Sequence, residues 1–319
     1  MEAREASPQW QCVLVCWGTL YGAGVINHLV QRIRAQSARP ARYVLITEAP
    51  KPGLDPEVVI RPFPEFFLRE RFRRSGCQAK LAMFEPGVVP DDLPAIYVDL
   101  DTVITGDISR GIGLMKDRRS VIMLQSSPLP FGWPGRLVHR LTRGRSYARG
   151  NSSVLVYHPA ECGYIAERFR ALDARYPEFG SFRPMVADER FISWVAQRHM
   201  MAHPSDYAVK FTTEFMAPWR WLIAPRAHLP WVRRRRERQA AVTLNGPEIK
   251  PEILLALPEG GEITDRKHRH LIWSDAAMGP ARGRILAHCR AVAGPGAEAA
   301  AQSGGAASLP GAPAPGPAD

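Results

Sequence analysis

The sequence has no long apolar run. No window of its 319 residues approaches the ~20 consecutive apolar residues that a membrane-spanning helix requires. We therefore expect no transmembrane segment. The start of the sequence also lacks the pattern of a signal peptide, because two acidic residues, one Arg and two Gln come before the first apolar run or open it. No internal repeat is visible.

Cysteine is scarce, and its spacing fits no paired site. The chain has 5 cysteines, an odd number, and no two of them form a CxxC motif. They are scattered along the chain at Cys12, Cys16, Cys77, Cys162 and Cys289. A disulfide framework or a cysteine zinc site is therefore not expected, and the pattern favours a reducing, cytoplasmic compartment.

The bulk composition is that of a folded protein. Apolar residues make up 45% and charged residues 23% of the chain, which excludes a wholly disordered chain and a coiled coil. The segment 291–319 differs, because it holds 11 Ala, 6 Gly and 5 Pro and cannot bury a core. We expect an N-terminal extension at 1–10, one folded domain at 11–290 and a disordered tail at 291–319.

Strands and helices are predicted to alternate over the first 100 residues. Short apolar runs predict strands at 11–17, 41–47, 58–60 and 95–100, and later at 120–124 and 153–157. Helical spacing of apolar residues predicts helices at 21–35, 78–84, 160–174 and 188–198. This alternation indicates βαβ units in an α/β domain with a mostly parallel central sheet. The pattern after about residue 200 is less regular.

Two acidic residues end the strand predicted at 95–100. Asp99 and Asp101 stand at positions i and i+2, so in an extended chain their side chains point the same way. The carboxyl ends of parallel strands open onto the ligand crevice of α/β sheets. Paired carboxylates there suit Mg²⁺ or Mn²⁺ bound to a phosphorylated ligand. The alternative is a pair of solvated loop acids.

Two enzyme classes use such a pair. The string from Asp99 to Val103 matches the DxDx[TV] motif of dehalogenase-type phosphatases, in which Asp99 would be the nucleophile. In nucleotide-sugar glycosyltransferases, a DxD motif holds the metal on the donor diphosphate. The phosphatase motif normally ends the first strand of its domain, whereas two strands and two helices precede Asp99. The position therefore favours the glycosyltransferase.

The chain resembles bacterial GT-A-type glycosyltransferases, and more distantly the glycogenin and lipopolysaccharide galactosyltransferase class. The resemblance covers most of residues 11–255. It rests on the strings at 16–22 (CWGTLYG), 80–84 (KLAMF), 97–108 (YVDLDTVITGDI) and 150–156 (GNSSVLV). It implies a single GT-A-like, Rossmann-related domain and transfer of a sugar from a nucleoside-diphosphate sugar.

The resemblance also assigns donor-binding residues, most of which have an ordinary structural alternative. The loop after the first strand would receive the nucleotide, Lys80 would contact phosphate unless it is a solvated surface lysine, and Glu48 could bind the base or ribose. The donor set comprises Trp17, Gly18, Thr19, Tyr21, Thr47, Lys80, Asp99, Asn151, Gly246 and Lys250.

A third metal ligand is expected near the C-terminal end of the domain. Residues 244–251 (LNGPEIKP) are similar to the family's H-x-G-x-x-K-P segment, with Asn245 in place of the ligating His and one extra residue before Lys250. The resemblance thus implies Mn²⁺ or Mg²⁺ held by Asp99, Asp101 and Asn245, and Lys250 on the diphosphate. An Asn oxygen is a weaker ligand than His, which leaves the third position open.

Asp188 and Glu189 are the expected catalytic residues. In the resembling family, acids at this chain position bind sugar hydroxyls near the reacting centre. Asp188 would act as general base if the reaction inverts configuration, whereas a retaining reaction needs no base there. Acids that favour a helix N-terminus are the structural alternative. Lys210 is a further candidate for the same pocket.

Two clusters combine arginine with aromatic residues. One contains Arg61, Arg69, Arg71, Arg73 and Arg74 among phenylalanines, and the other contains Arg233–Arg236 and Arg238 near Trp219, Trp221 and Trp231. We expect each cluster to form either a solvated face of the protein or a peripheral contact with an anionic membrane. Nucleic acid is disfavoured, because the sequence has no recognised binding motif.

The sequence thus predicts a glycosyltransferase that moves a hexose from a UDP-sugar to a saccharide or lipid-linked saccharide acceptor in surface polysaccharide or glycolipid synthesis. It would work in the cytoplasm, peripherally at the inner face of the membrane. Two alternatives stay open: the phosphatase with Asp99 as nucleophile, and a non-catalytic module that binds the membrane surface.

Overall fold

The computed structural model describes residues 9–74, 76–178 and 180–293. Residues 1–8 of the predicted extension and 294–319 of the predicted tail lie outside these ranges. Residues 291–293 end the helix α11 (Ala281–Ala293). Within the described ranges, no helix combines the length and the apolar character needed to cross a bilayer.

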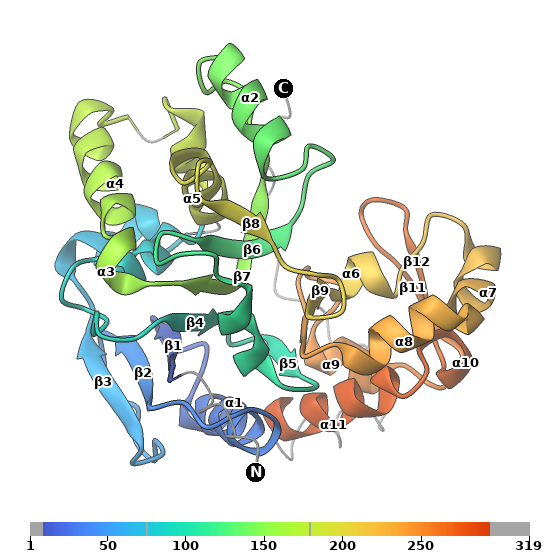
Figure 1. The fold of residues 1–319 in the computed structure, drawn as a ribbon. Coiled ribbons are helices and arrows are strands. Elements are labelled where there is room, and N and C mark those ends of the chain that lie inside the picture. The colour runs from blue at the N-terminus through green and yellow to red at the C-terminus, as the bar shows by residue number, and fades with distance from the viewer. Residues whose placement is uncertain (1–8, 75, 179, 294–319) are drawn as a thin grey trace, which may run out of the picture.

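A seven-stranded sheet lies at the centre of the described chain (Figure 1). The strand order is β3-β2-β1-β4-β7-β6-β8, and β7 alone runs antiparallel to its neighbours β4 and β6. The strands are β1 (Gln11–Cys16), β2 (Arg42–Thr47), β3 (Val58–Pro62), β4 (Ala95–Val98), β6 (Val121–Gln125), β7 (Gly150–Tyr157) and β8 (Met200–Ala202). The predicted α/β architecture with a mostly parallel sheet is confirmed.

Each face of the sheet is covered by a separate core. Val13 and Val15 of β1 pack into one core, and Cys12 and Leu14 into the other, because side chains alternate along a strand. Helix α1 covers the second face, while α4, α5 and the 3₁₀ helix η3 cover the first. The helices of this half are α1 (Ala23–Gln36), α2 (Trp133–Leu141), α3 (Pro159–Cys162), α4 (Tyr164–Arg175) and α5 (Asp188–Val195).

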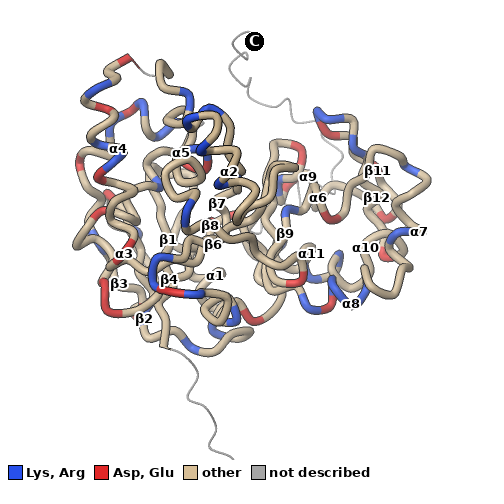
Figure 2. The backbone as a smooth tube through the Cα atoms, turned by 45° about the horizontal axis from the view of Figure 1, so that its top comes forward, with Lys and Arg blue, Asp and Glu red and all other residues tan. Residues whose placement is uncertain are grey.

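Charged residues of both signs are spread over the backbone. Figure 2 shows blue and red segments along most elements, with blue prominent around α5 and α8 (Pro230–Arg238). The excess of basic over acidic residues, which gives the chain its net charge of +11, therefore lies in a few segments and is not spread evenly.

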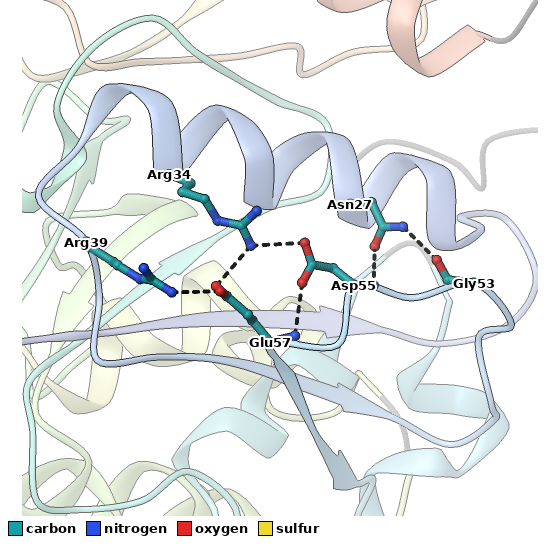
Figure 3. A network of polar contacts seen from close by, with 6 residues as sticks. All are labelled: Asn27, Arg34, Arg39, Gly53, Asp55 and Glu57. Atoms are coloured by element: carbon teal, nitrogen blue, oxygen red, sulfur yellow. Dashed lines mark hydrogen bonds and ion pairs between the residues drawn. The ribbon is translucent and has the colours of Figure 1, made fainter.

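The connection between β2 and β3 is held against α1 (Figure 3). The amide of Asn27 donates to Gly53 O at 2.7 Å and accepts from Asp55 N at 2.8 Å. Arg34 adds contacts of 3.0 Å to Asp55 and Glu57. Because both ends of the Asn27 amide are used, the loop that follows β2 has a fixed path beside the carboxyl end of β1.

The last third of the chain forms a smaller part with its own core. Strand β5 (Thr102–Ile104) pairs with β10 (Ala241–Thr243), which also pairs with β9 (Ala208–Lys210). The other elements are the hairpin β11 (Gly261–Thr264) and β12 (His270–Trp273), and the helices α6 (Phe211–Glu214), α7 (Ile223–His228), α9 (Pro251–Ala256) and α10 (Asp275–Met278). The β5–β10 pairing brings residues after 243 next to the acid pair.

Helix α11 returns to the N-terminal half. It lies beside α1 in Figure 1, and the rings of His28 and His288 are 5.1 Å apart. The carboxyl-terminal part is therefore attached to the main sheet by the β5–β10 pairing and the α1–α11 contact, and Ala208, Ala240 and Ala241 also pack into the core that α1 covers.

Three sequence predictions differ in detail from the structure. The helix predicted at 78–84 is the 3₁₀ helix η3 (Gln78–Phe84). The strand predicted at 95–100 ends at Val98. The helix predicted at 160–174 is divided into α3 and α4 at Gly163, where a Cβ atom would lie 3.2 Å from the ring of Pro86.

Candidate active site

Asp99 and Asp101 lie in a turn rather than in an extended strand. Asp99 N donates to Ser153 O at 2.8 Å, and Thr102 N donates back to Asp99 O at 3.0 Å. The expectation of an extended pair is wrong, because the chain leaves the sheet after Val98 and re-enters a strand at Thr102. The turn keeps the carboxylates close: burial and, second, the charge of Asp99 together raise the pKa of Asp101 to about 6, against the opposing effect of Lys250 and Lys80.

The first acid has partners for both of its oxygens. Lys80 Nζ lies 2.5 Å from Asp99 Oδ2, and Tyr97 Oη donates to Asp99 Oδ1 at 3.1 Å. The alternative of a solvated surface lysine is wrong, since Lys80 is buried. Burial alone would lower its pKa, but Asp99 raises the pKa of Lys80 well above its usual value. Lys80 thus stays charged and neutralises Asp99.

The second acid has an unpartnered oxygen that faces no protein donor. Lys250 Nζ lies 3.6 Å from Asp101 Oδ2, whereas Asp101 Oδ1 is buried without a hydrogen bond. Asn245 Oδ1 is buried and unpartnered as well. Leu244 N donates to Asp101 O at 3.1 Å, which places Asn245 directly beside the acid turn.

These two oxygens fit a divalent cation. Unpartnered buried polar oxygens are rare because their desolvation is costly, and hard oxygen ligands suit Mg²⁺ or Mn²⁺. No group of three His, Cys, Asp or Glu that could hold a metal occurs in the described ranges. Asn245 supplies the third side chain that such a group would lack, and Asp99 can add a lone pair beside its existing partners.

The loop after β1 meets the loop after β2. Gly18 has φ of 66°, a left-handed conformation that favours glycine. Its N–H donates to Glu48 Oε1 at 2.5 Å, and its carbonyl accepts from Lys51 Nζ at 2.7 Å. Two candidate residues, Gly18 and Glu48, are therefore in direct contact at the carboxyl ends of neighbouring strands.

The remaining candidates of this region differ in their positions. Tyr21 is close to the acid turn, because burial and then the charges of Asp101 and Asp99 raise the pKa of its hydroxyl. Trp17 is half-buried and Thr19 is exposed. The Thr47 side chain is buried and donates to a carbonyl of its own loop, Ala49 O, at 3.2 Å. Tyr21 is thus the member of this set that the fold brings to the acids.

Asp188 begins α5 and is buried. Its Oδ2 accepts from Ser152 Oγ at 2.6 Å, and its N–H donates to Gly76 O at 2.9 Å. Burial raises the pKa of Asp188 to about 6, although Lys80 and the Ser152 hydrogen bond lower it. Lys80 therefore lies in the field of both Asp99 and Asp188, which links α5 to the DxD turn.

Glu189 and Asn151 form a second contact between α5 and β7. Asn151 Nδ2 donates to Glu189 Oε2 at 2.9 Å. Burial lowers the pKa of Lys210, and Glu189 partly offsets this effect, so Lys210 shares the same region. Gly246, with φ of 117°, allows the chain to turn between Asn245 and Lys250.

Sequence reasoning missed several contributors. Ser152 binds Asp188, Tyr97 binds Asp99 and Lys51 binds Gly18. Ser152 and Tyr97 both lie inside the strings that carried the resemblance, but a hydroxyl partner of a distant acid has no local pattern. The fold alone reveals these pairs.

Part of the first arginine cluster is bound within the protein, whereas Arg73 and Arg74 are exposed. Phe67 and Phe72 are fully buried. Arg69 and Arg71 both bind Asp173 at 3.0 Å and 2.7 Å. The interleaved phenylalanines therefore reflect a core with bound guanidinium groups rather than an open surface.

The second cluster is divided. Arg235 and Arg236 both bind Glu214 at 2.7 Å, and Arg238 binds Asp206 at 3.2 Å. Arg233 and Arg234 are exposed. Three nearby tryptophans are also exposed: Trp219 (59%), Trp221 (72%) and Trp231 (64%). This part of the second cluster is available to a partner.

The phosphatase alternative fits the site poorly. The phosphatase motif normally ends the first strand of its domain, whereas Asp99 follows the fourth strand of this chain.

Comparison with solved structures identifies the fold. No model of a known protein family matches the sequence, and a comparison with curated proteins gives no match either. The galactosyltransferase LgtC, in complex with donor and acceptor sugar analogs, is 12% identical, with 88% of this chain and 95% of that chain covered and a TM-score of 0.53. The bifunctional glycosyltransferase WbbM is 11% identical, with 94% and 52% covered and a TM-score of 0.52. The described chain has the GT-A fold, as the sequence predicted.

Proposed function

We propose that this GT-A chain is a glycosyltransferase that moves a sugar from a nucleoside-diphosphate sugar to an acceptor hydroxyl. The donor would be a UDP-sugar, and the reaction would serve surface polysaccharide or glycolipid synthesis. The pair of buried, unpartnered oxygens on Asp101 and Asn245, with Lys250 beside them, carries this proposal. The chain shares its fold with glycosyltransferases, and these three residues would bind the cation and the diphosphate that such a reaction uses.

Asp101, Asn245 and Asp99 would hold Mn²⁺ or Mg²⁺. The bound cation would supply positive charge to the diphosphate as the sugar leaves. Lys250, half-exposed beside Asp101, would contact the same diphosphate. Lys80 would hold the carboxylate of Asp99 in position, a role that its 2.5 Å contact supports.

Asp188 and Glu189 would hold hydroxyl groups of the sugars. The pKa of Asp188, raised by burial to about 6, lies in the range that suits a proton acceptor near neutral pH. An inverting reaction would use Asp188 in that way, whereas a retaining reaction would use it to position the sugar. Trp17, Gly18, Thr19, Tyr21 and Thr47 would border the nucleotide.

The location would be the cytoplasm, at the inner face of the membrane. Cys12, Cys16, Cys162 and Cys289 are buried free thiols, which suits a reducing compartment. Exposed Arg233 and Arg234, together with the neighbouring tryptophans, would provide the peripheral contact with anionic lipid.

Calorimetric titration tests this proposal. The full chain is titrated with UDP, GDP and UDP-sugars in the presence and absence of Mn²⁺. We expect one nucleotide to bind in a metal-dependent way, and Asp101→Ala to abolish this binding. Asp91→Ala, a matched loss of an exposed acid, should bind like the wild type. Absence of nucleotide binding under every condition would overturn the proposal.

A further inference from the structure

A cavity of about 820 Å³ lies beside the candidate active site. One wall comes from residues 127–149, which connect β6 to β7, and the other from residues 182–194, which include the start of α5. Five arginines line it: Arg143, Arg145, Arg149, Arg183 and Arg190. We call this the arginine cavity. Its volume falls within the ~300–1,000 Å³ of typical ligand sites.

The arginines of the cavity have no acidic partners. Within the described ranges, none of the five forms an ion pair with Asp or Glu, whereas Arg71 and Arg236 elsewhere do. Tyr147 lies among them: burial raises the pKa of its hydroxyl, and Arg190, Arg149 and Arg183 lower it. Five guanidinium groups thus line one hollow with no ion-paired acid among the described residues, and four of them are exposed, which leaves them available to an anion.

The arginine cavity adjoins the proposed reaction centre but is separate from the DxD turn. Arg190 directly follows Asp188 and Glu189, and Arg149 directly precedes β7. Gly150 N donates to Ser193 Oγ at 2.9 Å, which fixes the start of β7 against α5. On α5, Arg190 and Trp194 are four residues apart and share the face that lines the cavity. An anion there would belong to the acceptor, because Asp101 and Lys250 mark the donor diphosphate.

Helix α2 lies between the segments 127–129 and 143–149 that line the cavity, and it exposes an apolar stripe. Trp133 is 71%, Leu137 47% and Leu141 73% exposed. Their spacing of four residues places them on one helix face, and exposed Arg136 and Arg140 flank it. Figure 1 shows α2 beside α5. Figure 2 shows basic segments around both helices. An exposed apolar stripe with arginines suits the membrane interface.

We propose that the arginine cavity binds the phosphate of an anionic membrane lipid, the lipid-linked acceptor, while the stripe of α2 lies against the bilayer. The proposal rests on the proposed function only where it identifies this lipid as the acceptor of the sugar. The charge complementarity and the adjacent apolar helix argue for a lipid rather than a soluble phosphate.

Vesicle co-sedimentation of the full chain tests the site. The probes are phosphatidylcholine vesicles alone and vesicles of phosphatidylcholine and phosphatidic acid at about nine to one. We expect binding to the second kind only. Arg149→Gln/Arg190→Gln should weaken it at least about tenfold, since each arginine to phosphate contact is a strong charge-assisted bond. Lys116→Gln/Arg118→Gln, the same loss of charge at two exposed residues of the loop before β6, should change it less than about threefold.

Variants of α2 test whether the bound phosphate belongs to a lipid or to a soluble compound. Leu137→Ser/Leu141→Ser should lose vesicle binding but keep calorimetric binding of inorganic phosphate, measured without added metal, which the cavity variant should lose. Equal loss of vesicle binding in the cavity variant and the Lys116 and Arg118 variant would overturn the cavity as the site. Phosphate binding without vesicle binding by the wild type would overturn the lipid. Lipid binding without any nucleotide binding would reject the proposed function and leave the cavity standing.

Discussion

Lys80 and Asp99 form a buried ion pair, with Lys80 Nζ 2.5 Å from Asp99 Oδ2. Asp101 follows two residues later, and its pKa is raised by burial and by Asp99. The turn thus holds two carboxylates near one buried cation, Lys80, while the Nζ of the half-exposed Lys250 lies 3.6 Å from Asp101 Oδ2. This excess of negative charge is the electrostatic condition under which a divalent cation binds well.

Removal of Lys80 should destabilise the protein through Asp99. We expect Lys80→Met to lower the free energy of unfolding by about 3 kcal/mol, because a buried carboxylate loses its partner. The double variant Lys80→Met/Asp99→Asn should regain most of the loss. Urea denaturation at neutral pH measures both, with exposed Lys116→Met as the control. A double variant no more stable than the single one would contradict the assigned pairing.

Asp101→Asn should remove the response to metal without loss of fold. In the wild type, Mn²⁺ should raise the melting temperature, since a ligand that binds the native state stabilises it. Asp101→Asn should abolish the rise, and Asn245→Ala should reduce the Mn²⁺ affinity about tenfold or more. Differential scanning calorimetry with and without Mn²⁺ reports the shift. If Asn245→Ala responds like the control Asp91→Asn, Asn245 is not a ligand.

Asp188→Asn should stabilise the free protein at alkaline pH. The folded-state pKa of about 6 exceeds the ordinary 3.8, so the ionised form is disfavoured in the fold. The resulting penalty is fully present above pH 6 and disappears as the pH falls towards 3.8. At pH 8 the variant should therefore gain up to about 3 kcal/mol. Denaturation curves at pH 8 and pH 4.5 measure the gain, which should shrink at the lower pH. A variant less stable than the wild type at both values would refute this.

His203 should contribute to acid sensitivity. Burial lowers its pKa from 6.5 to about 4, and its Nε2 lies 3.0 Å from Val154 O. The neutral ring is favoured in the fold, so its contribution is present above pH 6.5 and is lost as the pH falls towards 4. Between pH 8 and pH 5, His203→Gln should remove about 2 kcal/mol of the stability loss. Exposed His228→Gln serves as the control, and an equal pH dependence in both variants would rule out His203 as the cause.

The sequence predicted the first half of the fold well. Helix α1 buries Ile26, Leu29, Val30 and Ile33, the spacing of a helix that packs on one face. The centres of strands β1 and β2, residues 12–16 and 43–46, are apolar runs, which is typical of strands buried on both faces. These signals are local, so they could be read from neighbouring residues.

The site was predictable only where its residues lie close together in the sequence. Asp99 and Asp101 are two residues apart, but the partners of Asp99 and Asp188 come from other elements. The arginine cavity joins residues 143–149 with residues 183–190, and no local pattern connects them. The phenylalanines near Arg69 and Arg71 suggested a surface because an amphipathic face and a core look alike in a short window.

Asn245 reaches the acid turn only through the pairing of β10 with β5. Most of the chain must therefore be synthesised before the last oxygen of the site is in place. A nascent chain that ends before β10 would contain the turn with both acids but would lack Asn245. If Asn245 is a metal ligand, as proposed, cation binding would require that translation has passed β10, and a product truncated before this strand would not bind the metal even with its main sheet formed.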